Sequence, residues 1–305
     1  MKIRRREFLG NAVTGAAGAL TPGELLKAAP AGTASSVPTG MVPLGKQSKL
    51  TVSRLGIGTG MRAWMRESNH TRLGREKFEA TLRYGYDQGL RLFDMADLYG
   101  AHEYVARVLA GKPRESYTLV SKIWFHPRGL PEKERPDADV VVKRFLKELK
   151  TDYIDLVQIH CMSKRDWPRQ MRKQMDLMEG LKEKGLIRAH GVSCHSIAAL
   201  EAAAEEPWVD VVHARINPYA TKMDGPPEKV VPALRKIHNA GKGIIGMKLI
   251  GEGTFGNNPE KRARSVRFVV GLGFVNTMIV GFERPKEIDE FVTRVRKALA
   301  RQATA

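Results

Sequence analysis

The chain has 305 residues, which is long enough to bury one large hydrophobic core or two ordinary ones and excludes a small disulfide-stapled scaffold. Hydrophobic residues make up 42% and charged residues 28% of the sequence, a composition typical of folded globular proteins and not of disordered ones. No apolar run approaches the roughly 18 residues of a membrane-spanning helix, so stable membrane insertion is not expected. The formal net charge of +18 would attract anionic partners of several kinds, and the sign alone selects none of them.

Residues 1–31 are predicted to be an export signal. A basic start that contains Arg5 and Arg6 leads into a short, weakly apolar stretch, and residues 29–31, Ala-Pro-Ala, provide a small-residue cleavage site. This order resembles a twin-arginine signal, with a basic amphipathic helix as the alternative. The resemblance implies export of the folded protein by the twin-arginine machinery and a periplasmic or other extracytoplasmic location.

The folded domain is expected to follow a short linker. Residues 32–40 are rich in Ala, Gly, Ser, Thr and Pro, which favours a linker, so the domain is expected over 41–305. At its start, residues 41–53 contain a Gly-Lys turn between two β-like pieces. This pattern predicts a β-hairpin ahead of the main fold, placed to close the bottom of a barrel.

From residue 54 onward, short β-branched apolar runs alternate with longer amphipathic stretches, which is the pattern of successive βα units. Eight strands are expected, at 54–60, 91–96, 117–123, 154–160, 189–195, 209–216, 243–249 and 277–283. Eight such units in a chain of this length predict the α/β class and a (β/α)₈ TIM barrel. An open doubly wound sheet is disfavoured because no G-x-G-x-x-G turn follows the first strand.

Titratable side chains stand at the ends of three expected strands. Asp94 lies at the end of the second strand and Tyr99 shortly after it, Lys122 ends the third and His160 ends the fourth. In a barrel of this type the carboxyl ends of the strands meet at one mouth, where catalysis takes place. Each residue alone could equally be structural, but four such groups at one mouth favour an active site.

The segments LGIGTG, LFDMADLYGAHE, LVSK, DYIDLVQIH, GLIRAHGVS and IVGFERPKEIDE follow one another in the order and spacing of the aldo-keto reductases. Over nearly all of its mature length the chain resembles this family. The resemblance implies a barrel that binds a nicotinamide cofactor, NAD(P)H, without a Rossmann domain and reduces aldehydes or ketones. It also implies a catalytic tetrad of Asp94, Tyr99, Lys122 and His160.

The chemistry of carbonyl reduction fits these four side chains. Hydride delivery builds negative charge on the carbonyl oxygen, so a proton donor is needed there, and Tyr99 is expected to be that donor. The Lys122 ammonium is expected to lower the pKa of the phenol, and Asp94 to keep Lys122 charged. His160 is expected to hydrogen-bond the carbonyl oxygen and to orient the small-molecule substrate.

The resemblance also implies the cofactor site. Its expected residues are Ser193, His213, Met247, Lys248, Gly281, Arg284 and Glu287. Three positions depart from the family's pattern, because a Ser-Asn pair reads Ser193-Cys194, a glutamine is His213 and a ring-stacking tyrosine is Met247. Glu287 favours NADH, since a carboxylate repels the 2′-phosphate of NADPH, but the neighbouring Arg284 and Lys286 leave NADPH open.

The predicted mouth carries aromatic and basic side chains. Trp64 and Trp124, with arginines close by in the sequence, are expected to bind substrate, and sugars or carboxylate-bearing carbonyls would suit them. Nucleic acid is not an expected partner, because the basic run that includes Lys143 and Lys147 is interleaved with apolar residues, as on an ordinary amphipathic helix.

Two other functions remain open at this stage. A metal-binding barrel could use His160, Cys194, His195 and His213, although no C-x-x-C or H-E-x-x-H spacing supports it. A nicotinamide-binding sensor or adaptor without catalysis is the other alternative. Cys161 and Cys194 lie on neighbouring expected strands, and a disulfide between them is possible, with two free thiols as the default.

Overall fold

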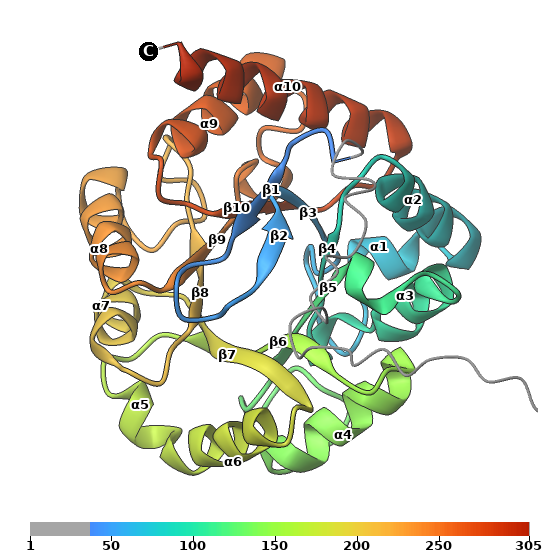
Figure 1. Cartoon of the computed structure of the whole chain (residues 1–305), viewed down its shortest axis with the longest axis vertical. Helices are drawn as coiled ribbons and strands as arrows, with labels where there is room; N and C mark the ends of the chain where they lie inside the picture. The colour runs from blue at the N-terminus through green and yellow to red at the C-terminus, as the bar shows by residue number, and fades with distance from the viewer. Residues whose placement is uncertain (1–36, 305) are drawn as a thin grey trace, which may run out of the picture. The chain divides into compact units, whose positions relative to one another are not determined.

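The computed structural model describes residues 37–304, which form a closed barrel surrounded by helices (Figure 1). Eight parallel strands pair in chain order, and the last pairs with the first. They are β3 (Leu55–Gly58), β4 (Leu92–Asp94), β5 (Thr118–Ile123), β6 (Ile154–Met162), β7 (Ile187–Cys194), β8 (Val211–Arg215), β9 (Gly243–Met247) and β10 (Thr277–Val280). The predicted (β/α)₈ barrel is confirmed, and each expected strand is present.

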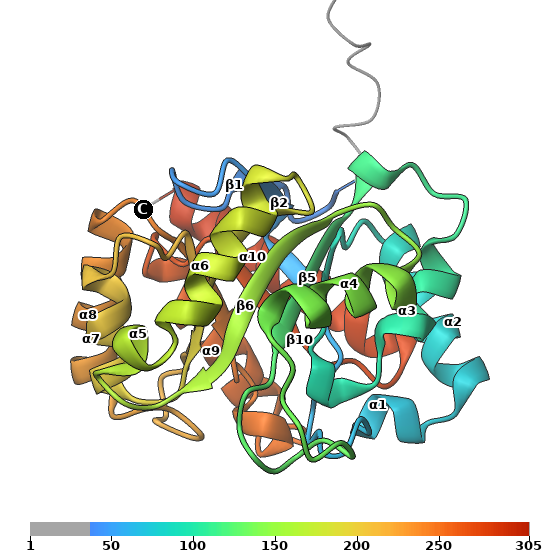
Figure 2. The ribbon, with the colours of Figure 1, turned by 90° about the horizontal axis from the view of Figure 1, so that it is seen from below.

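Helices cover the outside of the barrel, as Figures 1 and 2 show. The longer ones are α2 (Arg75–Asp87), α3 (His102–Leu109), α4 (Ala138–Leu149), α6 (Arg172–Glu183), α7 (Ile197–Glu205), α8 (Pro227–Asn239), α9 (Pro259–Gly271) and α10 (Pro285–Ala303). The short helices are α1 (Asn69–Arg72) and α5 (Trp167–Gln170), with 3₁₀ turns η2 (Asp97–Tyr99), η3 (Arg114–Ser116) and η4 (Gly251–Gly253). Each longer helix turns an apolar stripe to the strands; in α6, for instance, Met175 and Met178 are fully buried.

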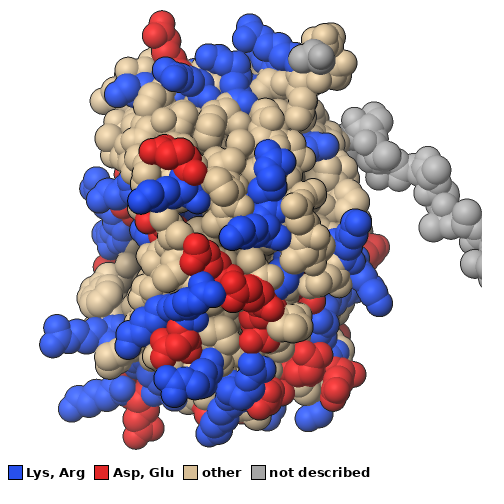
Figure 3. All heavy atoms as spheres, turned by 90° about the vertical axis from the view of Figure 1, so that its left-hand side faces the viewer, with Lys and Arg blue, Asp and Glu red and all other residues tan. Residues whose placement is uncertain are grey.

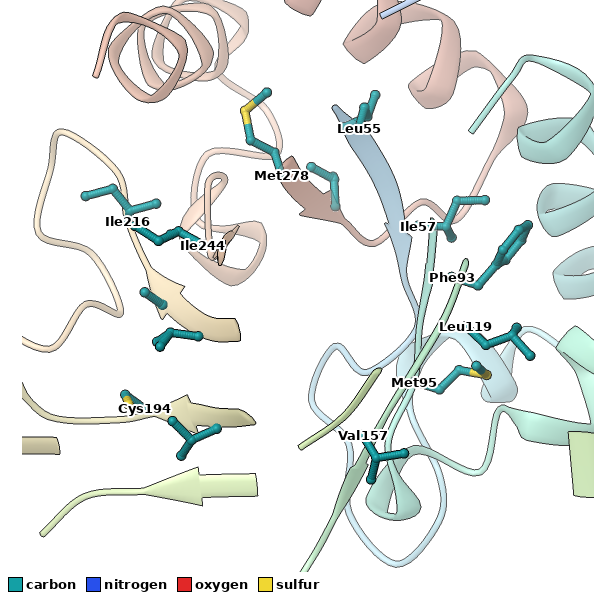
Figure 4. Packing of buried hydrophobic residues seen from close by; sticks show 14 of the residues in the cluster. Leu55, Ile57, Phe93, Met95, Leu119, Val157, Cys194, Ile216, Ile244 and Met278 are labelled. Carbon is teal, nitrogen blue, oxygen red and sulfur yellow. The ribbon is translucent and has the colours of Figure 1, made fainter. Parts of the chain in front are cut away.

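The main hydrophobic core lies between the barrel and its helices. Figure 4 shows side chains from successive strands, among them Leu55, Phe93, Leu119 and Val157, pointing into this layer. Because side chains alternate along a strand, every second residue points outward to the helices and the others point into the barrel. The inward positions near the carboxyl ends are therefore available for polar groups.

The bottom of the barrel is closed by a hairpin of β1 (Met41–Pro43) and β2 (Thr51–Ser53), as predicted. Its side chains Leu44 and Val52 are fully buried against inward residues of the strands, such as Leu156. The turn approaches the start of β9 so closely that a Cβ on Gly45 would lie 2.3 Å from the Gly243 nitrogen. Gly45 also has a φ of +72°, so both the lack of space and the backbone conformation require glycine at this position.

The expected export signal, residues 1–31, lies outside the described residues, and so does most of the expected linker. Residues 37–40 form a turn in which Gly40 accepts a hydrogen bond from the Arg54 nitrogen at 3.1 Å, and Thr39 is only 3% exposed. The last residues of the expected linker are therefore packed on the barrel domain.

The surface carries the excess of basic side chains. On the face shown in Figure 3, which is the side of α7 and α8, Lys and Arg are interspersed with Asp and Glu. Two members of the basic run on α4 are likewise paired, since Lys143 contacts Asp139 at 3.0 Å and Arg144 contacts Asp97 at 2.9 Å. Within residues 37–304, none of the helices is long and apolar enough to cross a membrane.

Candidate active site

The four residues expected to act in catalysis meet at the carboxyl end of the barrel. Asp94 is the last residue of β4, Tyr99 ends the turn η2, and Lys122 and His160 lie near the ends of β5 and β6. Lys122 Nζ makes an ion pair with Asp94 Oδ1 and donates a hydrogen bond to the Met95 carbonyl at 2.9 Å. The Tyr99 hydroxyl lies 3.4 Å from His160 Nε2. The predicted grouping of these side chains is therefore present.

The Asp94–Lys122 pair is almost completely removed from water, with side-chain exposures of 3% and 1%. Burial lowers the pKa of Lys122, and the Asp94 carboxylate acts in the opposite direction. Burial alone would raise the pKa of Asp94, but Lys122 and His213 hold it below its ordinary value. Each charge thus favours the charged form of the other, and the expected role of Asp94 in catalysis stays a prediction.

The expected effect of Lys122 on Tyr99 is wrong for this arrangement. Burial raises the pKa of the Tyr99 phenol well above its ordinary value, and the Asp94 carboxylate raises it further. The Lys122 ammonium lies 5.2 Å from the centre of the Tyr99 ring, and its charge is balanced by Asp94. Tyr99 is therefore a neutral phenol, which still has its proton to donate.

His160 is also neutral. Burial lowers its pKa well below the ordinary value, and the nearby Lys122 charge lowers it further. Its ring meets the Tyr99 ring edge-on at 5.6 Å and the Trp124 ring at 5.1 Å, so the imidazole is held between two aromatic side chains. A neutral imidazole can donate one hydrogen bond without adding a second charge beside Lys122.

His213 has a different neighbour from the one the sequence suggests. Its Nε2 lies 3.0 Å from Asp94 Oδ1, and its side chain is fully buried. Burial lowers the pKa of His213 to about 4, so the ring is uncharged near neutral pH. The structure thus places this residue behind the tetrad; its expected contact with a cofactor stays a prediction.

Two further features hold Tyr99 in place, and neither is apparent from the sequence alone. A Cβ on Gly60 would lie 2.3 Å from the Tyr99 ring, so the ring packs directly against the backbone there. Asp97, two residues before Tyr99, is buried between Arg66 at 3.1 Å and Arg144 at 2.9 Å. These ion pairs fix the turn η2 to the loop before α1 and to α4.

A cavity opens beside the tetrad, with about 600 Å³ of free space including its open entrance. Its lining includes Asp94 and Tyr99 from the tetrad and Met247, Lys248 and Gly281, which are expected at the cofactor site. The cavity continues into a groove with about 1360 Å³ of free space, also open to solvent, which ends at the start of α10. The two share the lining residues Met61, Ile250, Glu252, Val280 and Gly281.

The far end of the groove contains two more of the residues expected to bind cofactor. Arg284 and Glu287 both line it, and Arg284 donates to Glu287 Oε1 through Nε at 2.9 Å and Nη2 at 2.6 Å. The second oxygen of Glu287 accepts from the Glu283 nitrogen at 2.9 Å, which ties the segment before α10 to the first turn of the helix. The seven expected cofactor residues are thus divided, because five line the cavity or groove and Ser193 and His213 do not.

Ser193 and the two tryptophans occupy different positions around the mouth. Ser193 Oγ accepts a hydrogen bond from the Cys161 nitrogen at 2.8 Å and is almost fully buried. Trp124 stands next to His160, and its indole nitrogen donates to the Arg128 carbonyl at 2.5 Å. Trp64 is 49% exposed, on the loop after β3. Only Trp124 contacts the tetrad directly.

The alternative metal site does not form. Cys194 is buried in the apolar layer outside the barrel (Figure 4), whereas His213 points inward to Asp94. Residues 37–304 contain no group of three His, Cys, Asp or Glu side chains that could hold a metal ion. Cys161 and Cys194 are both free thiols, and Cys161 Sγ contacts His195 Nδ1 at 3.2 Å.

Comparison with known proteins agrees with this geometry. A family model described as the aldo/keto reductase family matches residues 54–268, which is more than half of the sequence. The chain belongs to the aldo/keto reductase family. This membership confirms the predicted class, an NAD(P)-dependent oxidoreductase of the aldo-keto reductase type.

Individual relatives are distant. The chain is 28% identical over 254 residues to the aldo-keto reductase YhdN of Bacillus subtilis, covering 75% of this chain and 72% of YhdN. It is 28% identical over 175 residues to the methylglyoxal reductase DkgB of Salmonella typhi, covering 56% of this chain and 59% of DkgB. The solved structure of PA4992 from Pseudomonas aeruginosa has a TM-score of 0.68 at 26% identity, covering 85% of this chain and 96% of that one.

Proposed function

We propose that this protein reduces an aldehyde or ketone with a nicotinamide cofactor, and that Tyr99 donates the proton. The observation that carries the proposal is the approach of two neutral donors, the Tyr99 hydroxyl and the His160 imidazole, to within 3.4 Å of each other beside a cavity. A carbonyl oxygen bound next to both would receive two hydrogen bonds. The family membership supports the same reaction.

The described residues fit a dinucleotide in an extended form. The nicotinamide would supply the hydride when bound, and Met247 can cover an aromatic ring through its thioether. The groove then leads past Gly281 to Arg284 and Glu287, which would face the adenosine end. Because Glu287 already binds Arg284 in two hydrogen bonds, this cation is less available for a 2′-phosphate, which favours NADH over NADPH.

In the proposed reaction the protein residues act mainly through position and charge. Tyr99 gives its proton to the carbonyl oxygen as negative charge develops there, and His160 holds that oxygen in place. The Lys122 ammonium, 5.2 Å from the centre of the Tyr99 ring, would attract the phenolate that forms, but only in part, because Asp94 balances most of its charge. Asp94 keeps Lys122 protonated for this step.

The substrate is proposed to be a small carbonyl compound. Trp124 provides an aromatic plane next to His160, and the exposed Trp64 lies on a loop that begins at the same mouth. The similarity to a methylglyoxal reductase supports a small aldehyde, and the basic side chains of these loops would suit a carboxylate group on it.

Tyr99→Phe tests the proton donor. Only a hydroxyl is lost, so the fold and dinucleotide binding should remain, whereas carbonyl reduction should fall by about 10² to 10⁴ fold. The matched control is Tyr84→Phe, which removes a hydroxyl that contacts Asp289 on the surface at 2.7 Å. Turnover of the Tyr99 variant close to that of the control would show that the assignment is wrong.

A binding protein without catalysis is the competing function, because three positions of the cofactor site depart from the family's pattern. A screen of small aldehydes, ketones and sugars with both nicotinamide cofactors separates the two. Turnover of any carbonyl by the wild type excludes a purely binding role. Tight dinucleotide binding with no turnover across the screen would favour the sensor or adaptor.

The proposed location is extracytoplasmic, by twin-arginine export, and it is supported by the pattern of residues 1–31. Free nicotinamide cofactors are recycled in the cytoplasm, so an exported reductase would need to keep its cofactor. In this proposal the dinucleotide is loaded before export, reduced by one substrate and reoxidised by another in place. Protein taken from the periplasm, desalted and denatured should release one dinucleotide per chain; empty protein that binds added cofactor weakly would contradict retention.

A further inference from the structure

Glu252 occupies the junction between the cavity and the groove. It belongs to the turn η4 after β9, and it lines both the cavity beside Tyr99 and the groove that leads to α10. A ligand that extends from Tyr99 to Arg284 through the cavity and the groove would therefore pass close to this carboxylate. The side chain is 21% exposed, so it is partly enclosed by the walls of the passage.

Three basic side chains surround the Glu252 carboxylate. Lys248 Nζ donates to Oε1 at 2.7 Å, and Lys222 Nζ lies 4.0 Å from Oε2. Arg62, from the loop after β3, lines the same groove and lies close enough to act on the carboxylate. Burial alone would raise the pKa of Glu252, but Lys248 and the other two cations hold it below its ordinary value. The junction is thus a site of three cations, and the anion that they surround is the carboxylate of Glu252 from the same chain.

The backbone holds this carboxylate in an uncommon conformation. Lys248, Gly251, Glu252 and Gly253 all have positive φ, at +62°, +57°, +58° and +91°. Such values are rare for residues that have a side chain. Asn217, which is fully buried, donates to the Lys248 carbonyl at 3.1 Å and so fixes the start of the turn. Glycines on both sides of Glu252 leave the turn itself able to change conformation.

The position matches the centre of an extended dinucleotide. If the nicotinamide lies beside Tyr99 and the adenosine beside Arg284, the diphosphate lies between them, at the junction where Glu252 now stands. A diphosphate carries negative charge and would seek the same cations. Resting on the proposed function, we propose that Glu252 is an internal anion that occupies the diphosphate position in the empty enzyme and is displaced from Lys248 when the dinucleotide binds.

Glu252→Gln tests this displacement by removing the competing charge at nearly constant size. Isothermal titration of NADH, NADPH and inorganic pyrophosphate should give dissociation constants about three- to tenfold lower than for the wild type, because no ion pair is broken on binding. The matched control is Glu201→Gln, which removes a carboxylate paired with Arg165 at 3.0 Å on α7, outside the cavity and groove. This control should bind all three ligands as the wild type does.

The same substitution in a Lys248→Met variant shows whether Glu252 and the dinucleotide compete for Lys248 itself. In Lys248→Met, dinucleotide binding should weaken, and the gain from adding Glu252→Gln should shrink, because the shared cation is gone. A gain that persists in full would mean that Glu252 acts only through its general charge, and the displacement would be wrong. Equal or weaker binding by Glu252→Gln alone would also overturn the proposal.

The pyrophosphate titration separates this inference from the proposed function. A wild type that binds neither NADH nor NADPH would contradict the proposed function, while pyrophosphate would still report on Glu252. Because Glu252 acts against binding in this proposal, Glu252→Gln is also the variant in which cofactor retention after export should be easiest to detect.

Discussion

Replacing Asp94 by asparagine should destabilise the protein strongly, because it leaves a buried cation without its partner. The side chains of Asp94 and Lys122 are 3% and 1% exposed. The substitution keeps size and shape and leaves Lys122 Nζ two neutral acceptors, the new amide oxygen and the Met95 carbonyl, but it removes the negative charge that balances the ammonium. Breaking one side of a buried ion pair typically costs about 3 to 5 kcal/mol, a large share of the ~5 to 15 kcal/mol that stabilises most proteins.

The loss should depend on pH in a defined direction. Without Asp94, the pKa of Lys122 in the folded protein falls further below that of the unfolded chain, which is about 10.4. Between these two values the unfolded state binds more protons than the folded state, so the stability of Asp94→Asn rises with pH. The free energy of unfolding of Asp94→Asn should therefore fall furthest below that of the wild type near neutral pH, and the difference should shrink toward pH 9 to 10.

Urea denaturation followed by tryptophan fluorescence measures these differences. Asp94→Asn/Lys122→Met should recover most of the stability lost in Asp94→Asn, because the unpaired charge is removed and an apolar side chain of similar length remains. Asp139→Asn, which removes an exposed partner of Lys143, is the control and should change stability little. An Asp94→Asn variant within about 1 kcal/mol of the wild type, or a double variant less stable than the single one, would refute the reasoning.

Three other predictions follow from separate contacts. Gly60→Ala should displace the Tyr99 ring, because a Cβ at residue 60 would lie 2.3 Å from it. Turnover in a steady-state assay should therefore fall by at least about tenfold. Gly180→Ala is the control, because a Cβ there meets open space and should not reduce turnover. Glu287→Gln should release Arg284 and raise the preference for NADPH over NADH severalfold, measured as the ratio of kcat/KM values; an unchanged ratio would mean that the pair does not control the choice. Lys242, whose pKa burial lowers to about 8, should make the wild type gain stability between pH 8 and 10 relative to Lys242→Met, since the unfolded lysine keeps its proton to higher pH. Parallel stability curves for those two proteins would contradict the last prediction.

The barrel could be predicted because its pattern is local. Each strand is a short apolar run and each helix a longer amphipathic stretch, so the alternation is visible along the sequence. The tetrad could be placed for the same reason, because Asp94, Lys122 and His160 stand at strand ends and parallel strands bring these ends together.

Contacts between distant segments could not be predicted in the same way. The packing of Gly60 on Tyr99 depends on the exact path of two loops, and the enclosure of Asp97 depends on arginines 31 residues before it and 47 residues after it. The neutral state of Tyr99 depends on how deeply the phenol is buried and on where Lys122 points, and a sequence shows neither. Cys161 illustrates the same limit, because it lies within an irregularity of the strand register between Ile159 and Met162, and Cys194 pairs with Met162 instead.

The hairpin that closes the bottom of the barrel also determines at which end the protein can be linked to a support or a fusion partner without blocking the active site. The folded domain begins beside this seal, and the strands carry their reactive ends to the opposite side, as Figure 2 shows. A support, a fluorescent protein or an electrode linked through the chain ahead of Met41 would thus join the sealed end and leave the mouth facing solution. Linkage through side chains of the loops after β3 or β5, by contrast, would place the attachment at the entrance that substrates must use.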